Sequence, residues 1–205
     1  MHTILITGAG SGIGAATAKV LSRHEGFRLI LMSRRLEPLE AVRQSCKRPE
    51  SHVVVSKDVA DAEAMVDWLS GEEANLSTHP LVGVFANAGI GGPNDFGPGD
   101  RWEEIIRINL TGTYNTLMAC RPHLMASPTG GHALVTSSVL ARFGVPGQTA
   151  YVASKTGLLG LVRSLAVEWS PHGVMVNALC PGWVETEMAQ ASIQGMADAQ
   201  GISYE

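Results

Sequence analysis

The chain opens with His2-Thr-Ile-Leu-Ile-Thr7, continues with Gly8-Ala-Gly-Ser-Gly-Ile-Gly14, and then enters a segment of helical periodicity at residues 15–24. An apolar run, a glycine cluster and a helical segment in that order predict a strand, a tight turn and a helix. Similar pairs of apolar runs and helical segments follow along the whole chain, so this opening indicates how the remainder is built.

Strands and helices are expected to alternate throughout. Residues 28–32 are too apolar to alternate, as expected of a strand that is buried on both faces of a parallel sheet. We predict parallel βαβ units in a three-layer α/β fold, with ligands bound beyond the carboxyl ends of the strands. No linker divides residues 1–205, so we expect one domain. The expected strands are 2–7, 28–32, 52–56, 81–85, 132–136 and 174–179, and the expected helices are 15–24, 36–47, 62–69, 100–125 and 149–170.

The composition excludes several classes of protein. Hydrophobic residues make up 45% of the 205 positions, and the net charge of −4 gives no basic footprint for nucleic acid. No apolar run approaches the ~18 residues of a membrane span, and a strand starting at His2 leaves no room for a signal peptide. Three scattered cysteines argue for a reducing, cytoplasmic location, and seven scattered histidines show no metal-ligand spacing.

The glycine turn suits a dinucleotide cofactor. Gly8 permits the tight turn, while Gly12 and Gly14 let the backbone approach a pyrophosphate and let the helix pack close to the sheet. The helix N-terminus adds free amides and a positive dipole end. The spacing is Gly-x-x-x-Gly-x-Gly rather than the usual Gly-x-Gly-x-x-Gly, and the alternative is a purely structural turn.

Arginines follow the second expected strand, in Ser33-Arg34-Arg35. A carboxylate at this place would bind the ribose 2′-hydroxyl of NAD, whereas arginines suit the 2′-phosphate of NADP. The charge therefore favours NADP, with NAD still possible. The alternative is that both arginines form a solvated entry to the next helix.

Tyr151 and Lys155 lie four positions apart at the start of the helix expected at 149–170, so both side chains can reach one site. A free phenol has a pKa near 10, and a nearby ammonium group lowers that pKa by favouring the phenolate. A tyrosine tuned in this way can exchange a proton with a substrate oxygen. Taken alone, the two residues also fit an ordinary surface pair.

In their order and rough spacing, the motifs resemble those of the classical short-chain dehydrogenase/reductase family. The resemblance covers nearly the whole chain, from Thr3 to Met188. It implies a Rossmann-type, doubly wound parallel sheet that binds NAD(P). The matching residues are Thr7 to Gly14, Asp58-Val59, Asn87-Ala88-Gly89, Asn109, Ser137-Ser138, Tyr151-x-x-x-Lys155 and Pro181-Gly182.

The resemblance implies four catalytic residues. Tyr151 would be the acid/base, and Lys155 would lower its pKa and bind the nicotinamide ribose. Ser138 would donate to the substrate oxygen, with Ser137 as its rival. Asn109 would hold a water that links Lys155 to solvent, although a mid-helix asparagine can instead bond backbone.

The resemblance also implies the binding residues. Asp58 would accept from the adenine amine unless it only caps a helix, and Thr186 would contact the nicotinamide carboxamide. Residues 87–89 would line the adenosine unless they form a plain turn. The cofactor site would comprise Gly8, Ser11, Gly12, Ile13, Gly14, Ser33, Arg34, Arg35, Asp58, Val59, Asn87, Ala88, Gly89, Tyr151, Lys155, Pro181, Gly182, Val184 and Thr186. The substrate would meet Ser138, Leu140, Phe143, Gln148, Tyr151 and Trp183, which form a largely apolar set.

The chain departs from the family pattern in a few places. Ser11 stands where many NADP-preferring members carry a basic residue, and Ala86 stands where many have asparagine. Family members usually continue for some tens of residues with a substrate lid and a last strand. This chain shows only the start of a lid after Met188, and no seventh strand. An uncovered edge strand exposes ladder groups and apolar surface, so we expect reduced stability or obligate association for the 205-residue chain.

We therefore predict an NADP(H)-dependent oxidoreductase that interconverts a ketone, or a 3-oxoacyl-type carbonyl, and a secondary alcohol. The alternatives are an NAD-dependent alcohol dehydrogenase of the same family and a non-catalytic dinucleotide-binding regulatory protein. In the family, the helices at 100–125 and 149–170 form a four-helix contact, so we expect a homodimer or homotetramer. We expect no nucleic-acid, membrane or metal partner.

Overall fold

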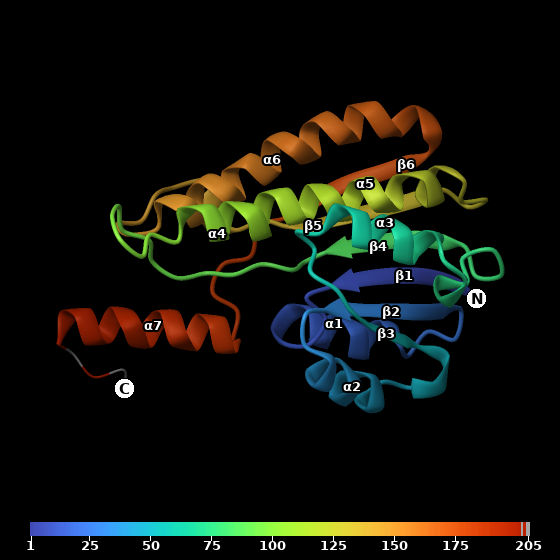
Figure 1. Cartoon of the computed structure of the whole chain (residues 1–205), viewed down its shortest axis with the longest axis horizontal. Helices are drawn as coiled ribbons and strands as arrows, with labels where there is room; N and C mark the ends of the chain where they lie inside the picture. The colour runs from blue at the N-terminus through green and yellow to red at the C-terminus, as the bar shows by residue number, and fades with distance from the viewer. Residues whose placement is uncertain (202, 204–205) are drawn as a thin grey trace.

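Six parallel strands form one sheet in the computed structural model of the chain, in the order β3-β2-β1-β4-β5-β6. The chain runs outward from β1 to β3, returns to β4 beside β1, and runs outward again to β6 (Figure 1). This is the predicted doubly wound, Rossmann-type sheet, and its switch point lies between β1 and β4. The structure describes residues 1–201 and 203. The strands are β1 (His2–Thr7), β2 (Phe27–Ser33), β3 (Val53–Ser56), β4 (Leu81–Ala86), β5 (Gly131–Thr136) and β6 (Val174–Leu179).

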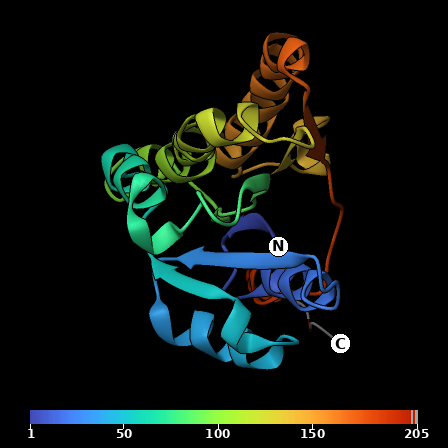
Figure 2. The same cartoon turned by 90° about the vertical axis from the view of Figure 1, so that its right-hand side faces the viewer.

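Helices cover both faces of the sheet and give the three predicted layers (Figure 2). The two faces have separate cores: α1 and α2 pack on one face, and α3, α5 and α6 pack on the other. β2 lies between these cores, which is why residues 28–32 form a continuous apolar run. No helix in the described part of the chain is both long and apolar enough to cross a membrane. The helices are α1 (Gly12–Leu21), α2 (Leu36–Ser45), α3 (Ala62–Ser70), α4 (Trp102–Ile106), α5 (Gly112–Met125), α6 (Thr149–Trp169) and α7 (Glu187–Gln200).

Three predicted helices differ from the structure by more than one residue. α1 runs from Gly12 to Leu21 rather than over 15–24, and α2 ends at Ser45 rather than at Lys47. The helix expected at 100–125 is not continuous: a π-helical turn, Arg107–Thr111, separates α4 from α5. Such π turns are often found at functional sites, and this one contains Asn109.

β6 is one of the two edge strands of the sheet, since it pairs only with β5 among the described residues. α6 covers one face of β6, whereas Met175 is 55% exposed and Leu179 is 45% exposed on the other. The described residues contain no seventh strand after β6; instead the chain forms α7. Apolar surface is thus exposed where we expected it, and the reduced stability or association of the chain stays a prediction.

Candidate active site and cofactor site

The glycine turn between β1 and α1 leaves no room for a side chain at Gly8 or Gly14. Gly8 and Gly12 have φ of +66° and +51°, a region that favours glycine. A Cβ on Gly8 would lie 2.9 Å from the Cα of Ala88, and one on Gly14 would collide with the carbonyl oxygen of Gly8. The turn therefore holds the start of α1 tightly against the ends of β1 and β4, where a helix N-terminus can bind an anion.

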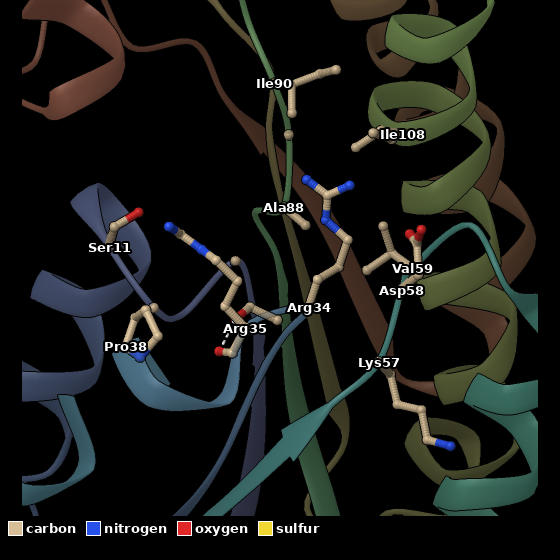
Figure 3. A pocket seen from close by; sticks show the side chains of 14 residues that line it. Ser11, Arg34, Arg35, Pro38, Lys57, Asp58, Val59, Ala88, Ile90 and Ile108 are labelled. Atoms are coloured by element: carbon tan, nitrogen blue, oxygen red, sulfur yellow. Dashed lines mark hydrogen bonds between the residues drawn. The ribbon is translucent and has the colours of Figure 1, made fainter. Parts of the chain in front are cut away.

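A cavity opens beyond the carboxyl ends of β1 to β4, at the predicted switch point. Figure 3 shows Arg35 extending toward Ser11 at the start of α1, while Arg34 extends between Ala88 and Val59. The residues expected in the cofactor site that line this cavity are Gly8, Ser11, Ser33, Arg34, Arg35, Asp58, Val59, Ala88 and Gly89. The lining residues not predicted are Gly10, Pro38, Lys57, Ile90 and Ile108.

The two arginines supply free positive charge at the end of β2. Both side chains are exposed, and neither forms an ion pair within residues 1–201. Their backbone is fixed, because Ser56 Oγ donates to the carbonyl of Arg34 at 2.8 Å and Ser33 Oγ donates to that of Arg35 at 3.1 Å. The backbone at Arg34 and Arg35 is thus held in place, while the two exposed guanidinium groups are free to move toward a bound anion.

Asp58 faces the same cavity but does not cap α3. The side chain of Asp61 does so, by accepting from the amide of Ala64 at 2.9 Å. Asp58 Oδ1 accepts from the amide of Ala60 at 3.0 Å, and its Oδ2 lies 3.5 Å from Nη1 of Arg107 in the π turn. The carboxylate is therefore held in place at the cavity wall.

Asn87 joins the ends of three strands. Its amide donates to Thr7 Oγ1 at 3.0 Å, and its Nδ2 donates to the carbonyl of Thr7 at 3.2 Å, which ties β4 to β1. Its Oδ1 accepts from Thr136 Oγ1 at 3.0 Å, which ties β4 to β5. The segment at 87–89 is consequently an anchored part of the site rather than a plain turn.

Tyr151, Lys155 and Ser138 lie together beyond the end of β5. Lys155 Nζ lies 5.6 Å from the centre of the Tyr151 ring and donates to the carbonyl of Thr136 at 2.9 Å. The Ser138 hydroxyl lies close enough to Tyr151 to favour the ionised form of its phenol. Ser137 instead donates to the backbone carbonyl of Lys155 at 2.8 Å. The geometry separates the two serines: Ser138 faces the phenol and Ser137 supports α6.

Burial shifts both titratable groups in the direction of their neutral forms. It raises the pKa of the Tyr151 phenol, and the nearby Ser138 hydroxyl opposes that rise. It lowers the pKa of Lys155 to about 8. The expected lowering of the tyrosine pKa by Lys155 is therefore not found, because desolvation outweighs any attraction between the two groups. At neutral pH the phenol is protonated.

Lys155 should make stability depend on pH. Its pKa is lower in the folded protein, at about 8, than its ordinary 10.5 in the unfolded chain, so the unfolded chain binds more protons between these values and stability rises with pH there. We expect Lys155→Met to raise the unfolding free energy at pH 7 by up to about 3 kcal/mol, with the gain shrinking toward pH 10.5. Denaturant melts from pH 7 to 10 test this. Lys47→Met at an exposed lysine is the control, and a gain independent of pH would contradict the expectation.

Asn109 lies fully buried in the π turn and holds the segment that follows β4. Its Oδ1 accepts from the amide of Ile90 at 2.8 Å, and its Nδ2 donates to the carbonyl of Ile90 at 2.9 Å and to Ser154 Oγ at 3.1 Å. A Cβ on Gly89 would lie 3.1 Å from Asn109 Oδ1 and 3.4 Å from Lys155 Nζ. The Asn109 side chain thus forms hydrogen bonds with the backbone of Ile90, and its role in holding a water stays a prediction.

The remaining predicted residues come from two neighbouring segments. The amide of Val139 donates to the carbonyl of Pro181 at 2.9 Å, which brings residues 139–143 beside the end of β6. Phe143 and Trp183 are exposed by 54% and 68%, and Val184 is also exposed, whereas Leu140 and Gln148 are half-buried.

α7 begins across the site. Thr186 caps it by accepting from the amide of Ala189 at 3.2 Å, and a Cβ on Gly12 would lie 3.2 Å from the Thr186 methyl group. A Cβ on Gly91 would lie 3.3 Å from Met188 Sδ and 4.0 Å from Tyr151 Cε2. The segment after Met188 thus starts beside both the glycine turn and Tyr151, as expected of the beginning of a lid.

Residues 2–197 match the family model described as short chain dehydrogenase. The chain belongs to the short-chain dehydrogenase family. It is accordingly an oxidoreductase of the kind that uses a nicotinamide dinucleotide and acts on alcohol or ketone groups.

Known proteins resemble this short-chain dehydrogenase along most of its length. Oxidoreductase UcpA of Escherichia coli K12 is 34% identical over 190 residues, which are 92% of this chain and 72% of that protein. The crystal structure of levodione reductase matches with a TM-score of 0.86 at 30% identity, covering 96% of this chain and 77% of that one. Carveol dehydrogenase from Mycobacterium avium, solved in complex with NAD, matches with a TM-score of 0.83 at 32% identity, covering 91% and 72%.

Proposed function

We propose that this short-chain dehydrogenase is an NADP(H)-dependent enzyme that interconverts a ketone and a secondary alcohol, with Tyr151 as its acid/base. The observation that carries the proposal is that Tyr151, Ser138 and Lys155 lie together at the carboxyl edge of the sheet. A dinucleotide fits the residues present, because the cavity beyond β1 to β4 is lined by backbone of the glycine turn, by Ser11 before α1 and by the exposed Arg34 and Arg35.

In this proposal, Tyr151, Ser138 and Lys155 each have a separate role in moving a proton to the substrate or in stabilising its oxygen. The bound nicotinamide supplies the hydride for reduction. Tyr151 Oη gives its proton to the substrate oxygen, while Ser138 Oγ donates a hydrogen bond to that oxygen as it gains negative charge. Because burial raises the pKa of Tyr151 and lowers that of Lys155 to about 8, a proton moves downhill from the Lys155 ammonium to the phenolate. Lys155 can therefore reprotonate Tyr151 after each reduction.

The preference for NADP rests on the free guanidinium groups of Arg34 and Arg35 and on the lack of a carboxylate at the end of β2. NAD is the competing cofactor, since the M. avium carveol dehydrogenase was solved with NAD. We expect Arg34→Ala to weaken NADPH binding about 10- to 100-fold, the value of a hydrogen bond to a charged group, with little change for NADH. Fluorescence titration with both cofactors tests this, with Arg163→Ala at an exposed position of α6 as control. Equal losses for both cofactors would refute the preference.

The substrate class is proposed as an uncharged ketone or secondary alcohol. Phe143, Trp183, Val184 and Met188 expose apolar surface on the two segments around Tyr151. Levodione and carveol, from the names of two similar proteins, are the first compounds to screen with NADPH and NADH, and 3-oxoacyl thioesters come second. Tight cofactor binding without turnover across the screen would favour the non-catalytic alternative.

The proposal also includes a homo-oligomeric assembly and a cytoplasmic location. Tyr114 on α5 and Val167 on α6 are exposed by 47% and 77%, which supports a homodimer or homotetramer formed by these helices. A cytoplasmic location is supported by three cysteines that are all unpaired, two of them buried.

A further inference from the structure

The segment between β4 and α4 passes beside the catalytic tyrosine but has little structure of its own. Gly92, Gly97 and Gly99 all have positive φ, and residues 87–101 form neither helix nor strand. In Figure 1 the segment runs out from β4 to the end of the molecule where α4 and α6 begin. Its course must therefore be fixed by a few contacts with its neighbours.

Asn94 makes the main contact with the start of α6. Its side chain is 8% exposed, and its Oδ1 accepts from the amide of Ala150 at 2.8 Å and from Thr149 Oγ1 at 3.1 Å. The backbone amide of Asn94 also donates to the carbonyl of Gly147 at 2.9 Å. Asn94, which lies 56 positions upstream of Ala150, thus accepts from a backbone N–H in the first turn of α6 that has no partner within the helix. That N–H belongs to the residue just before Tyr151.

Asp100 makes the matching contact with the start of α4. Its Oδ1 accepts from the amide of Trp102 at 3.0 Å and from Asn94 Nδ2 at 3.2 Å. The Asn94–Asp100 hydrogen bond therefore joins the N-terminus of α4, which leads to Asn109, to that of α6, which carries Tyr151 and Lys155. Neither residue belongs to the motifs that identify the family in this sequence.

We propose that the Asn94–Asp100 hydrogen bond positions Tyr151 for proton transfer. Both residues act through the first turn of α6, so they are positioning residues, and the proposal rests on the proposed acid/base role of Tyr151. The ring also lies close to Gly91 of the same segment, where a built Cβ would be 4.0 Å from Cε2. The segment thus fixes the tyrosine at its backbone and beside its ring. A displacement of about 1 Å at a reacting group can cost about 100-fold in rate.

A donor–acceptor swap tests the proposal. Asn94→Asp keeps the acceptor for Ala150 but sets two carboxylates against each other, so we expect kcat to fall about tenfold or more with the dissociation constant for NADPH unchanged. Asp100→Asn alone keeps its Oδ1 acceptor and should leave kcat within about twofold. The double variant restores one donor between the two side chains and should recover kcat to within about threefold of the wild type. A merely destabilised fold would not be rescued in this way.

A second readout does not depend on turnover. Loosening the first turn of α6 and adding a carboxylate there both change the surroundings of the phenol, so Asn94→Asp should shift the Tyr151 pKa from its wild-type value. The double variant, which has the same net charge as the wild type, should restore it. Phenolate absorbance, with the matching Tyr151→Phe background subtracted, measures this pKa. An Asn94→Asp variant with unchanged kcat or unchanged Tyr151 pKa would overturn the proposal. If the wild type turned over no carbonyl, the proposed function would fail while the pKa readout still tested the positioning.

Discussion

Tyr151→Phe should lower kcat about 1,000-fold, within the range of about 100- to 10,000-fold that a positioned acid/base contributes. The variant keeps the ring and loses the hydroxyl that Ser138 contacts, so the proton has no route to the substrate oxygen. The ring still packs beside Gly91 and below Lys155, and the dissociation constant for NADPH should change by less than about threefold. Single-turnover mixing with NADPH and the best ketone from the screen measures the chemical step directly.

The control for this variant is Tyr114→Phe on α5, a tyrosine that is 47% exposed and away from the site. It makes the same chemical change at a residue that does not line the cavity, and it should keep wild-type turnover. Retained turnover in Tyr151→Phe, with Tyr114→Phe also active, would remove Tyr151 from the proposed mechanism. A large loss of NADPH binding would instead assign the hydroxyl a binding role.

Gly14→Ala should abolish tight NADPH binding. The added methyl group would collide with the carbonyl oxygen of Gly8 and lie 2.8 Å from Asn87 Nδ2, and the carbonyl is backbone that cannot move without moving the turn. Overpacking of this kind costs about 1–3 kcal/mol of stability. Displacing two amides from a phosphate would lower affinity about 100- to 10,000-fold, since each hydrogen bond to a charged group is worth about 1.5–3 kcal/mol. Titration calorimetry with NADPH and thermal melting measure the two effects.

Gly26→Ala is the matched control, because a Cβ there meets no atom within 4 Å and Gly26 does not have a positive φ. It should bind NADPH like the wild type. Wild-type affinity in Gly14→Ala would show that the turn does not hold the cofactor phosphates.

The strands could be predicted from the sequence because burial on two faces leaves unbroken apolar runs, as at residues 28–32, and each strand agrees with the structure to within one residue at either end. The cavity at β1 to β4 was predictable because the carboxyl ends of parallel strands meet at one edge of the sheet, where ligands bind. Arg34, Arg35 and Asp58 each directly follow such a strand or lie within two residues of it.

Other features depend on contacts between distant residues that have no local pattern. The π turn forms where Asn109 bonds Ile90, and the sequence 107–111 reads as ordinary helix. Ile108, which lies in that turn, lines the cavity. The direction of the Tyr151 pKa shift depends on burial, which the spacing of Tyr151 and Lys155 does not reveal. Asn94 could have been noticed only as a polar residue in a glycine-rich loop.

Thr136 serves the two halves of the site with chemically different atoms. Its carbonyl accepts from Lys155 Nζ, whereas its hydroxyl donates to Asn87. Every amino acid at position 136 has the same backbone carbonyl, so a substitution there would leave Lys155 its acceptor. Only Asn87 would lose a hydrogen-bond donor, so the two contacts can change independently of each other.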